Sequence, residues 1–377
     1  MIVQERYLFL TGTRADFGKL KPLILAIAES DSASVSVFAT GMHLQPKYGL
    51  TIKEVEALNV PVFPFVNFGH GDSMAQITSK TISGLEDYIS AFPTDYLVIH
   101  GDRPEALAGA IVGIMRNIKV VHVEGGELSG TVDESVRHAV TKLSHIHLVS
   151  NDNARERVVG LGEDPATVFE IGSPELDVMN SETLPNLRSV REKYGLSEKP
   201  HCLFVMHPVT TQNPDVLASQ SSEILRQLAD IEDIQIVAIS PNNDAGSESI
   251  FQVLKDFSIE KQVRVIPSMR FEYYLSLLKS AEFIIGNSSS GVREAPFFGV
   301  PSINVGSRQN RRSNAKSILN ISNDDLSGLQ EILNLARRMP RIPERIFGDG
   351  NAAKRFANLV SHNAFARAPI QKQLHSD

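Results

Sequence analysis

The stretch RYLFLTGTRADFGKLKPLILAIAES, residues 6–30, begins with a short apolar run, turns at a glycine and continues with apolar residues at helical spacing. A run of strand length that leads directly into a segment of helix length predicts one βα unit. The next apolar run, SVSVFAT at 34–40, follows closely. Strands that alternate with helices in this way predict a parallel sheet with helices on both faces.

The alternation continues along the chain in two series. The first includes DYLVIHGD at 95–102 and KVVHVEGG at 119–126, and the second runs from HCLFVMHPV at 201–209 to VPSINVG at 300–306. Between them, residues 177–200 are polar and contain two prolines, which is typical of a domain junction. We therefore predict an α/β fold of two Rossmann-like doubly wound domains facing each other across a cleft. The predicted domains are 1–174 and 175–360, followed by a tail at 361–377 that we expect to be loose at its end.

The composition is that of an ordinary globular protein, with 42% hydrophobic and 21% charged residues among 377. A net charge of −7 argues against a nucleic-acid or membrane-surface binder, because both need a basic face. The single cysteine, Cys202, lies in the apolar run CLFVM, which predicts a buried thiol and a reducing compartment. We see neither a signal peptide in MIVQERYLFL nor an apolar run of membrane length, and we expect a cytoplasmic protein.

Charged residues follow the predicted strands of the first domain, at the strand ends where ligands bind in such sheets. Arg14 and Asp16 come after the first strand, in TGTRADFGKLKPL, and Asp102 and Arg103 come after DYLVI. These positions predict carboxylates and arginines that look toward a ligand. Each aspartate also has a structural alternative, because it could simply cap the helix that follows.

The segment HVEGGELSGTVDESVRHAV, residues 122–140, places four carboxylates close to one predicted strand end. Glu124 precedes two glycines that allow a sharp bend, and Asp133 lies four residues before Arg137, on the same face of a predicted helix. We predict that Glu124 and Asp133 line one pocket, with Arg137 binding an anion or keeping Asp133 ionised. The alternative is an exposed helical ion pair that contributes only ~0.3–0.5 kcal/mol.

Two motifs of the second domain also follow strands. His207 comes after HCLFVM, where it faces the predicted cleft or has a purely structural role. In GNSSSGVREAP, residues 286–296, the serines and Gly291 are expected to open a helix whose N–H groups and hydroxyls bind a diphosphate. Glu294, one turn into that helix, is placed to accept hydrogen bonds from ribose hydroxyls, and Arg308 follows the next strand. The alternative is a serine-rich helix cap.

Several long motifs resemble one family in their order and spacing. They are TGTRADFGKLKPL, HGDRPEALAG, HVEGGELSGTVDESVRHAVTKLSHIH, GSPELDVM, HPVTT, PNNDAGSESI and GNSSSGVREAPFFGVPSINVGSRQ. Together, from about residue 7 to about residue 320, they resemble the hydrolysing UDP-N-acetylglucosamine 2-epimerases of sialic acid biosynthesis. The RADFGKL and HGDR forms resemble the hydrolysing branch, because the non-hydrolysing bacterial epimerases carry different residues after the first and fourth strands.

The resemblance implies a glycosyltransferase B-type fold in which the first domain carries most of the catalytic carboxylates and the second holds UDP. It implies no cofactor and no metal, and it suggests a homodimer or homotetramer. The catalytic residues implied are Asp16, Asp102, Glu124 and Asp133, supported by Arg137 and His207. The residues implied to bind the UDP-sugar are Arg14, Arg103, His207, Asn242, Met269, Ser288, Ser289, Gly291, Glu294 and Arg308.

The reaction implied is the conversion of UDP-N-acetylglucosamine and water to N-acetylmannosamine and UDP. A base removes the proton at the carbon that bears the acetamido group while UDP leaves, and an acid later returns a proton from the opposite face. Inversion therefore needs groups on both faces of the sugar, which explains the excess of carboxylates. We expect Asp102, Glu124 and Asp133 to share these roles, with Asp16 contacting the sugar.

Other functions remain open on the sequence alone. A UDP-sugar glycosyltransferase would share the UDP site but need an acceptor, and relatives in other nonulosonic acid pathways act on UDP-diacetamido trideoxy sugars. A metal-dependent phosphoesterase would use pairs such as His100 with Asp102 and His122 with Glu124, although no compact metal motif occurs. A non-catalytic sensor of nucleotide sugars would gain little from extra negative charge near an anion.

Overall fold

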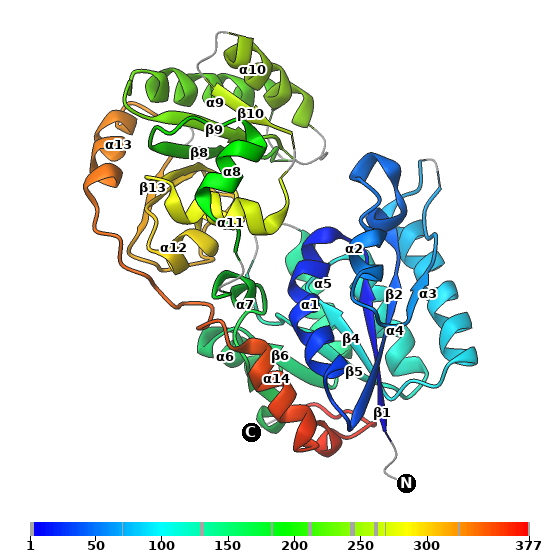
Figure 1. The fold of residues 1–377 in the computed structure, drawn as a ribbon. Helices are drawn as coiled ribbons and strands as arrows, with labels where there is room; N and C mark the ends of the chain where they lie inside the picture. The colour runs from blue at the N-terminus through cyan, green and yellow to red at the C-terminus, as the bar shows by residue number, and fades with distance from the viewer. Residues whose placement is uncertain are drawn as a thin grey trace. The chain divides into compact units, whose positions relative to one another are not determined.

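The structure is a computed structural model. It describes residues 4–69, 71–128, 132–181, 184–209, 213–241, 246–259, 263–267, 269–322 and 325–375. Contacts divide the chain into two compact units, Met1–Asn180 with Phe347–Asp377, and Ser181–Ile346. Each unit contains one parallel sheet with helices on both faces (Figure 1), so the predicted α/β fold of two Rossmann-like doubly wound domains is confirmed.

The first unit is built on a seven-stranded sheet in the order β3-β2-β1-β4-β5-β6-β7. The strand order reverses at β1, whose two neighbours are β2 and β4. Its strands are β1 (Glu5–Thr11), β2 (Ala33–Ala39), β3 (Val62–Pro64), β4 (Tyr96–His100), β5 (Lys119–Val123), β6 (Ile146–Val149) and β7 (Val168–Glu170). Its α-helices are α1 (Arg14–Ala28), α2 (Ile52–Glu56), α3 (Met74–Ala91), α4 (Pro104–Met115), α5 (Val132–Leu143), α6 (Asp152–Gly160), α7 (Glu175–Met179) and α14 (Ala352–Ser361), with short 3₁₀ turns at Gly41–Leu44, Pro46–Tyr48, Pro165–Thr167 and Ala364–Arg367.

Alternate residues of β1 face two different cores. Tyr7 and Phe9 pack with the apolar side chains of α1 and α14, whereas Leu8 and Leu10 pack with those of α3, α4 and α5. This follows from the two-residue period of a strand, which sends neighbouring side chains to opposite faces. A strand of a sheet that is buried on both faces therefore appears in the sequence as a continuous apolar run, such as YLFL.

The second unit repeats this design with a six-stranded sheet in the order β10-β9-β8-β11-β12-β13. Cys202 and Phe204 of β8 face one core, and Leu203 and Val205 face the other. Cys202 is fully buried as predicted, and burial raises the pKa of its thiol to about 12. The strands are β8 (His201–Val205), β9 (Gln235–Ile239), β10 (Val263–Ile266), β11 (Ile284–Gly286), β12 (Ser302–Val305) and β13 (Ile318–Ile321). The helices are α8 (Leu187–Tyr194), α9 (Pro214–Ala229), α10 (Ser247–Ile259), α11 (Phe271–Ser280), α12 (Glu294–Phe298) and α13 (Leu329–Arg338), with a 3₁₀ turn at Ser289–Gly291.

The predicted domain boundaries differ from this division in two places. Helix α7 lies beyond the predicted boundary at 174 but belongs to the first unit. Residues 347–360, predicted for the second domain, also return to the first unit, where α14 packs beside α1 (Figure 1). Apolar packing is the reason, because Phe356 of α14 is fully buried and makes edge-to-face contacts with the rings of Tyr7 and Phe9.

The C-terminal segment after α14 is held against the first unit instead of being loose. Phe365 is buried among the rings of Tyr96, Phe169 and Phe356. Further along, the Lys372 ammonium donates to the Lys142 carbonyl at 2.7 Å and to Glu163 Oε2 at 2.5 Å. Polar composition therefore misled the prediction for this tail, because the buried ring of Phe365 and the partly buried Lys372 anchor it. In the part of the chain that the structure describes, no helix has the length and apolarity to cross a membrane.

Candidate active site

The candidate site begins at the carboxyl edge of the first sheet. The strand order reverses there between β1 and β4, which is where ligands bind in doubly wound sheets. The connections after β1, β4, β5 and β7 bring charged side chains to this edge. They form two groups, one around Glu124 and one around Asp102.

Glu124 follows β5 directly and has a left-handed backbone, with φ at 62°. A glutamate rarely adopts this conformation, and such strain is typical of functional positions. Its carboxylate is 4% exposed and sits between three donors. His100 Nε2 is 3.0 Å and Lys19 Nζ 2.8 Å from Glu124 Oε2, and the Ser173 hydroxyl donates to Oε1.

Lys19 connects Glu124 to a second buried carboxylate. Its ammonium, on α1, lies 3.0 Å from Glu175 Oε2 as well as close to Glu124. Two buried carboxylates are stable together only with a cation and hydrogen bonds between them. We did not single out Lys19, Glu175 or Ser173 as site residues from the sequence, although all three lie in motifs that resemble the family. A lysine on the apolar face of α1, with a side chain only 17% exposed, is the signal that could have found this cluster.

Asp102 forms the second group with Arg137. The Arg137 guanidinium is buried, pairs with Asp102 Oδ2 and donates to the Glu127 carbonyl at 2.9 Å. Arg137 therefore orients Asp102, a partner that the spacing in the sequence could not indicate. Helix α4 begins after Arg103, which has no side-chain cap bond, so Asp102 is not the helix cap of the structural alternative. The side chain of Asp102 is 23% exposed, which leaves part of the carboxylate open to a ligand.

Asp133 lies in the first turn of α5, on the helix that carries Arg137, and is partly exposed. Helix α5 thus brings Asp133 and Arg137 to the same connection as Glu124 and Glu127. Glu127 itself is buried and accepts a hydrogen bond from the Ser150 hydroxyl.

Asp16 has the structural role that the sequence left as an alternative. Its buried carboxylate accepts hydrogen bonds from the Thr11 hydroxyl at 2.8 Å, the Gly12 N–H at 2.9 Å and both donors of Thr13, and it closes a capping box with Thr13. Four donors occupy the acceptor sites of one carboxylate. We therefore assign Asp16 to holding the β1–α1 turn, and the expected contact with the sugar gains no support from this geometry.

The arginines of the first unit point to nearby acids. Arg14 forms a 2.9 Å ion pair with Glu54 of α2, and Arg103 Nε lies 3.5 Å from Glu105 Oε2. Both guanidinium groups are more than a third exposed, so each can still meet an anion.

The histidines near this edge are engaged in the sheet. Fully buried His122 contacts the Gly101 carbonyl at 2.9 Å and the Thr141 hydroxyl at 3.1 Å, and burial lowers its pKa to about 3. His147 lies 3.0 Å from Glu163, and burial lowers its pKa too. These hydrogen bonds hold the imidazoles of His122 and His147 within the sheet.

Asn287 organises the corresponding edge of the second sheet. Its amide accepts from the His207 N–H at 2.7 Å and donates to the His207 carbonyl at 2.8 Å. The Asn287 carbonyl in turn accepts from Arg308 Nη1 at 3.0 Å and from Gln309 Nε2 at 2.9 Å. This residue, which we missed in the sequence, therefore ties together the loops after β8, β11 and β12. Gly286 before it is necessary, because a Cβ there would lie 2.0 Å from the Val205 carbonyl oxygen.

The serine-rich segment differs from the predicted helix. Ser288 caps a single 3₁₀ turn, Ser289–Gly291, and α12 begins only at Glu294, which is its first residue. The turn is tight because a Cβ at Gly291 would lie 2.6 Å from the Ser302 hydroxyl, and the Tyr274 hydroxyl holds Ser290 at 2.5 Å. The N–H groups of Ser290 and Gly291 bond to Ser288 within this turn, so the segment is a short turn and not the start of a long helix.

Two further residues were predicted for the UDP site of the second unit. Met269 precedes α11 and packs against one of the two cores. Asn242 lies outside the described residues.

Residues 25–361 match the sequence model of the family described as UDP-N-acetylglucosamine 2-epimerase. The chain belongs to this family. It is 46% identical to the UDP-N-acetylglucosamine 2-epimerase of Neisseria meningitidis serogroup B, over 98% of both chains. It is 34% identical to the UDP-N,N'-diacetylbacillosamine 2-epimerase (hydrolyzing) of Legionella pneumophila, over 94% of this chain and 95% of the relative. The polysialic acid biosynthesis protein P7 of Escherichia coli is 33% identical over 84% of this chain and 82% of its own length.

Solved structures of the epimerase family share the fold. A putative UDP-N-acetylglucosamine 2-epimerase from Listeria monocytogenes matches with a TM-score of 0.80 at 20% identity, covering 97% of this chain and 98% of its own. The Neisseria meningitidis UDP-GlcNAc 2-epimerase bound to UDP-GlcNAc matches with a TM-score of 0.81 at 17% identity, covering 95% and 100%. The UDP-N-acetylglucosamine 2-epimerase family and the glycosyltransferase B-type fold, both predicted from the sequence, are thereby confirmed.

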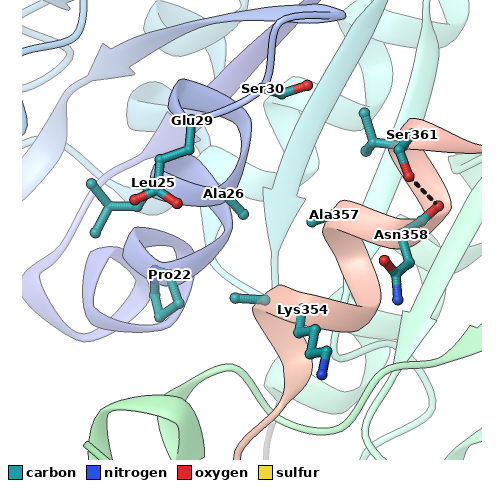
Figure 2. A pocket seen from close by; sticks show the side chains of 11 residues that line it. Pro22, Leu25, Ala26, Glu29, Ser30, Lys354, Ala357, Asn358 and Ser361 are labelled. Atoms are coloured by element: carbon teal, nitrogen blue, oxygen red, sulfur yellow. Dashed lines mark hydrogen bonds between the residues drawn. The ribbon is translucent and has the colours of Figure 1, made fainter.

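This epimerase-family chain also has a pocket that lies far from the candidate site. It measures about 440 Å³ and lies between the second half of α1 and α14 (Figure 2). Helix α1 starts at the carboxyl edge of the sheet, so residues such as Leu25 and Glu29 near its end lie at the amino edge. This pocket therefore lies at the amino edge of the unit, whereas the candidate site with its acids and cations lies at the carboxyl edge.

Proposed function

We propose that the chain is a hydrolysing UDP-N-acetylglucosamine 2-epimerase that catalyses the first step of sialic acid biosynthesis. It would convert UDP-N-acetylglucosamine and water into N-acetylmannosamine and UDP. The observation that carries this proposal is the pair of charge clusters at one sheet edge, with Glu124 held by Lys19 and His100 and Asp102 held by Arg137. The relatives named for a hydrolysing epimerase and for polysialic acid biosynthesis also support it.

The clusters suit an elimination followed by hydration. A carboxylate takes the proton from C2 as the C1–O bond to UDP breaks, which leaves a C1–C2 double bond. Water then adds its hydroxyl to C1, and an acid delivers a proton to the other face of C2. We propose that Asp102, Glu124 and Asp133 share the base, acid and water-activating roles, because Asp102 and Glu124 lie in connections at this edge and Asp133 lies in the first turn of α5.

We propose that the second unit supplies the UDP contacts, through His207, the turn at Ser288–Gly291 and Arg308. The Asn287 hydrogen bonds hold these three loops in register before any ligand arrives. Backbone N–H groups and an arginine are the donors that a diphosphate needs. We further propose a cytoplasmic homodimer or homotetramer that uses neither cofactor nor metal, so that turnover persists in excess chelator.

The test is ¹H NMR of the purified protein with UDP-N-acetylglucosamine in D₂O. We expect UDP and free N-acetylmannosamine in equal amounts, with deuterium at C2 of the product. Accumulation of UDP-N-acetylmannosamine without release of UDP would instead identify a non-hydrolysing epimerase. Dependence on an added acceptor would identify a glycosyltransferase.

A second candidate substrate has direct support from two relatives. The Legionella protein and a Campylobacter jejuni protein, 30% identical over 86% of both chains, are named for UDP- or GDP/UDP-N,N'-diacetylbacillosamine. The same NMR assay with the UDP-diacetamido trideoxy sugar decides between the two. A kcat/KM higher for that sugar than for UDP-N-acetylglucosamine would replace the proposed substrate while retaining the reaction.

A further inference from the structure

A pocket of about 240 Å³ opens on the first unit beside the connection that carries Asp102. It is lined by the loops that follow β2, β3 and β4, among them Gln45, Asn67, Arg103 and Glu105. We call it the Glu105 pocket. Its volume exceeds that of a water or a phosphate and is sufficient for part of a sugar ring.

Glu105 is the buried charge in the wall of this pocket. It is the second residue of α4 and only 4% exposed. Arg103 Nε approaches it at 3.5 Å, the long end of the hydrogen-bond range. A buried carboxylate with such a distant donor retains acceptor capacity, and a ligand hydroxyl is the natural group to fill it.

Two glycines leave space for this side chain because they lack a Cβ. A Cβ at Gly12 would lie 2.8 Å from Glu105 Cδ, and a Cβ at Gly41 would lie 2.8 Å from Glu105 Oε1. Gly41 also has a φ of 60°, which side chains rarely adopt. The ends of β1 and β2 thus leave room for the glutamate and fix where its carboxylate lies.

Asn67 ties together the rest of the wall through its side chain. Asn67 is fully buried, accepts from the Gly41 N–H at 3.1 Å and donates to the Thr81 hydroxyl at 2.9 Å. These bonds hold the loop after β3 against the loop after β2. A preformed wall of this kind can discriminate between ligands that differ in a single polar group.

We propose that the Glu105 pocket receives the hydroxyl-bearing side of the sugar at positions 4 and 6, and that Glu105 accepts a hydrogen bond from one of these hydroxyls. The inference rests on the proposed function and explains how the enzyme selects its substrate. A carboxylate acceptor favours N-acetylglucosamine, which has hydroxyls at both positions. A trideoxy sugar carries a methyl group at position 6, which would leave the buried Glu105 carboxylate with only the distant Arg103 donor.

The experiment combines Glu105→Gln with the removal of single substrate hydroxyls, in the manner of a double-mutant cycle. kcat/KM is measured for wild type and variant with UDP-N-acetylglucosamine and with its 4-deoxy and 6-deoxy analogues. We expect Glu105→Gln to lower kcat/KM about tenfold for UDP-N-acetylglucosamine, the loss of a charge-assisted bond. The loss should fall to about twofold or less for the analogue that lacks the bonded hydroxyl, because the interaction is already gone.

Two controls separate binding from folding. Glu86→Gln makes the same change in an exposed carboxylate of α3 that pairs with Arg116, and it should leave all three rates unchanged. The affinity of Glu105→Gln for UDP, which lacks the hexose, should equal that of wild type, which shows that the variant is folded.

The results distinguish this inference from the proposed function. Equal losses with all three substrates would overturn the role of the Glu105 pocket while leaving the epimerase reaction intact. Absence of turnover by the wild type with every UDP-sugar would reject the function and the inference together.

Discussion

Replacing Ser173 by alanine tests whether the orientation of Glu124 matters for the chemistry. Ser173 is 1% exposed, and its hydroxyl donates to Glu124 Oε1. Its N–H donates to the Phe347 carbonyl at 2.7 Å, and this bond survives the substitution. The variant therefore removes one side-chain contact from the candidate catalytic carboxylate and leaves the backbone path intact.

The expected magnitude follows from the kind of bond that is lost. A hydrogen bond from a hydroxyl to a buried carboxylate contributes about 1.5–3 kcal/mol. Lys19 and His100 still hold Oε2, so the carboxylate stays in place but can rotate. If about half to all of that energy orients Glu124 in the transition state, kcat falls roughly 4- to 150-fold.

The assay is steady-state release of UDP from UDP-N-acetylglucosamine, with kcat and KM measured across pH. We expect kcat to fall while KM changes less than about threefold, because Ser173 touches the carboxylate and not the proposed UDP loops. Ser173→Thr, which keeps the hydroxyl, should recover most of the rate.

Ser144→Ala is the matched control. Ser144 is equally buried, but its hydroxyl donates to the Val140 carbonyl at 2.8 Å at the end of α5. It should leave kcat unchanged. A kcat of Ser173→Ala within twofold of wild type, with the protein folded, would refute the idea that this bond positions Glu124.

Three further predictions concern separate parts of the chain. Asp102→Asn should lower kcat by ~10²-fold or more while UDP affinity is retained, as measured by NMR turnover and calorimetry; near wild-type turnover would remove Asp102 from the mechanism. Gly286→Ala should prevent soluble folding of the second unit, because its Cβ would lie 2.0 Å from the Val205 carbonyl oxygen. The control Gly18→Ala, with nothing described within 4 Å of the new Cβ, should express normally. Equal melting temperatures of the two variants would contradict this prediction. Burial raises the pKa of Glu163, but hydrogen bonds from His147, Lys142 and Lys372 outweigh it and lower the pKa to about 2, below the ordinary value of 4.5. The stabilising effect of Glu163 is therefore complete above about pH 5 and is lost as pH falls toward 2. Thermal melts should show this loss in the wild type and a smaller one in Glu163→Gln.

Local sequence patterns predicted most of the fold. The strand and helix predicted for residues 6–30 are β1 and α1, and the continuous apolar runs correctly indicated sheets buried on both faces. The same logic placed Asp102, Glu124 and His207 at strand ends, because the end of an apolar run is visible in the sequence. It failed for α14 and the C-terminal tail, since an amphipathic helix does not reveal which of two sheets it will cover.

The sequence by itself determined where charged residues leave the strands, because strand and helix periods are local properties of the chain. Only the tertiary structure decided which of those residues meet. Lys19 reaches Glu124 and Glu175, and Asn287 reaches His207, because the order of strands in each sheet brings distant connections to one edge. Asp16 shows the converse, since its carboxylate is consumed by the four donors of its own turn. A side chain's chemistry depends on its neighbours in space, and in a parallel sheet those neighbours come from connections that lie far apart in the chain.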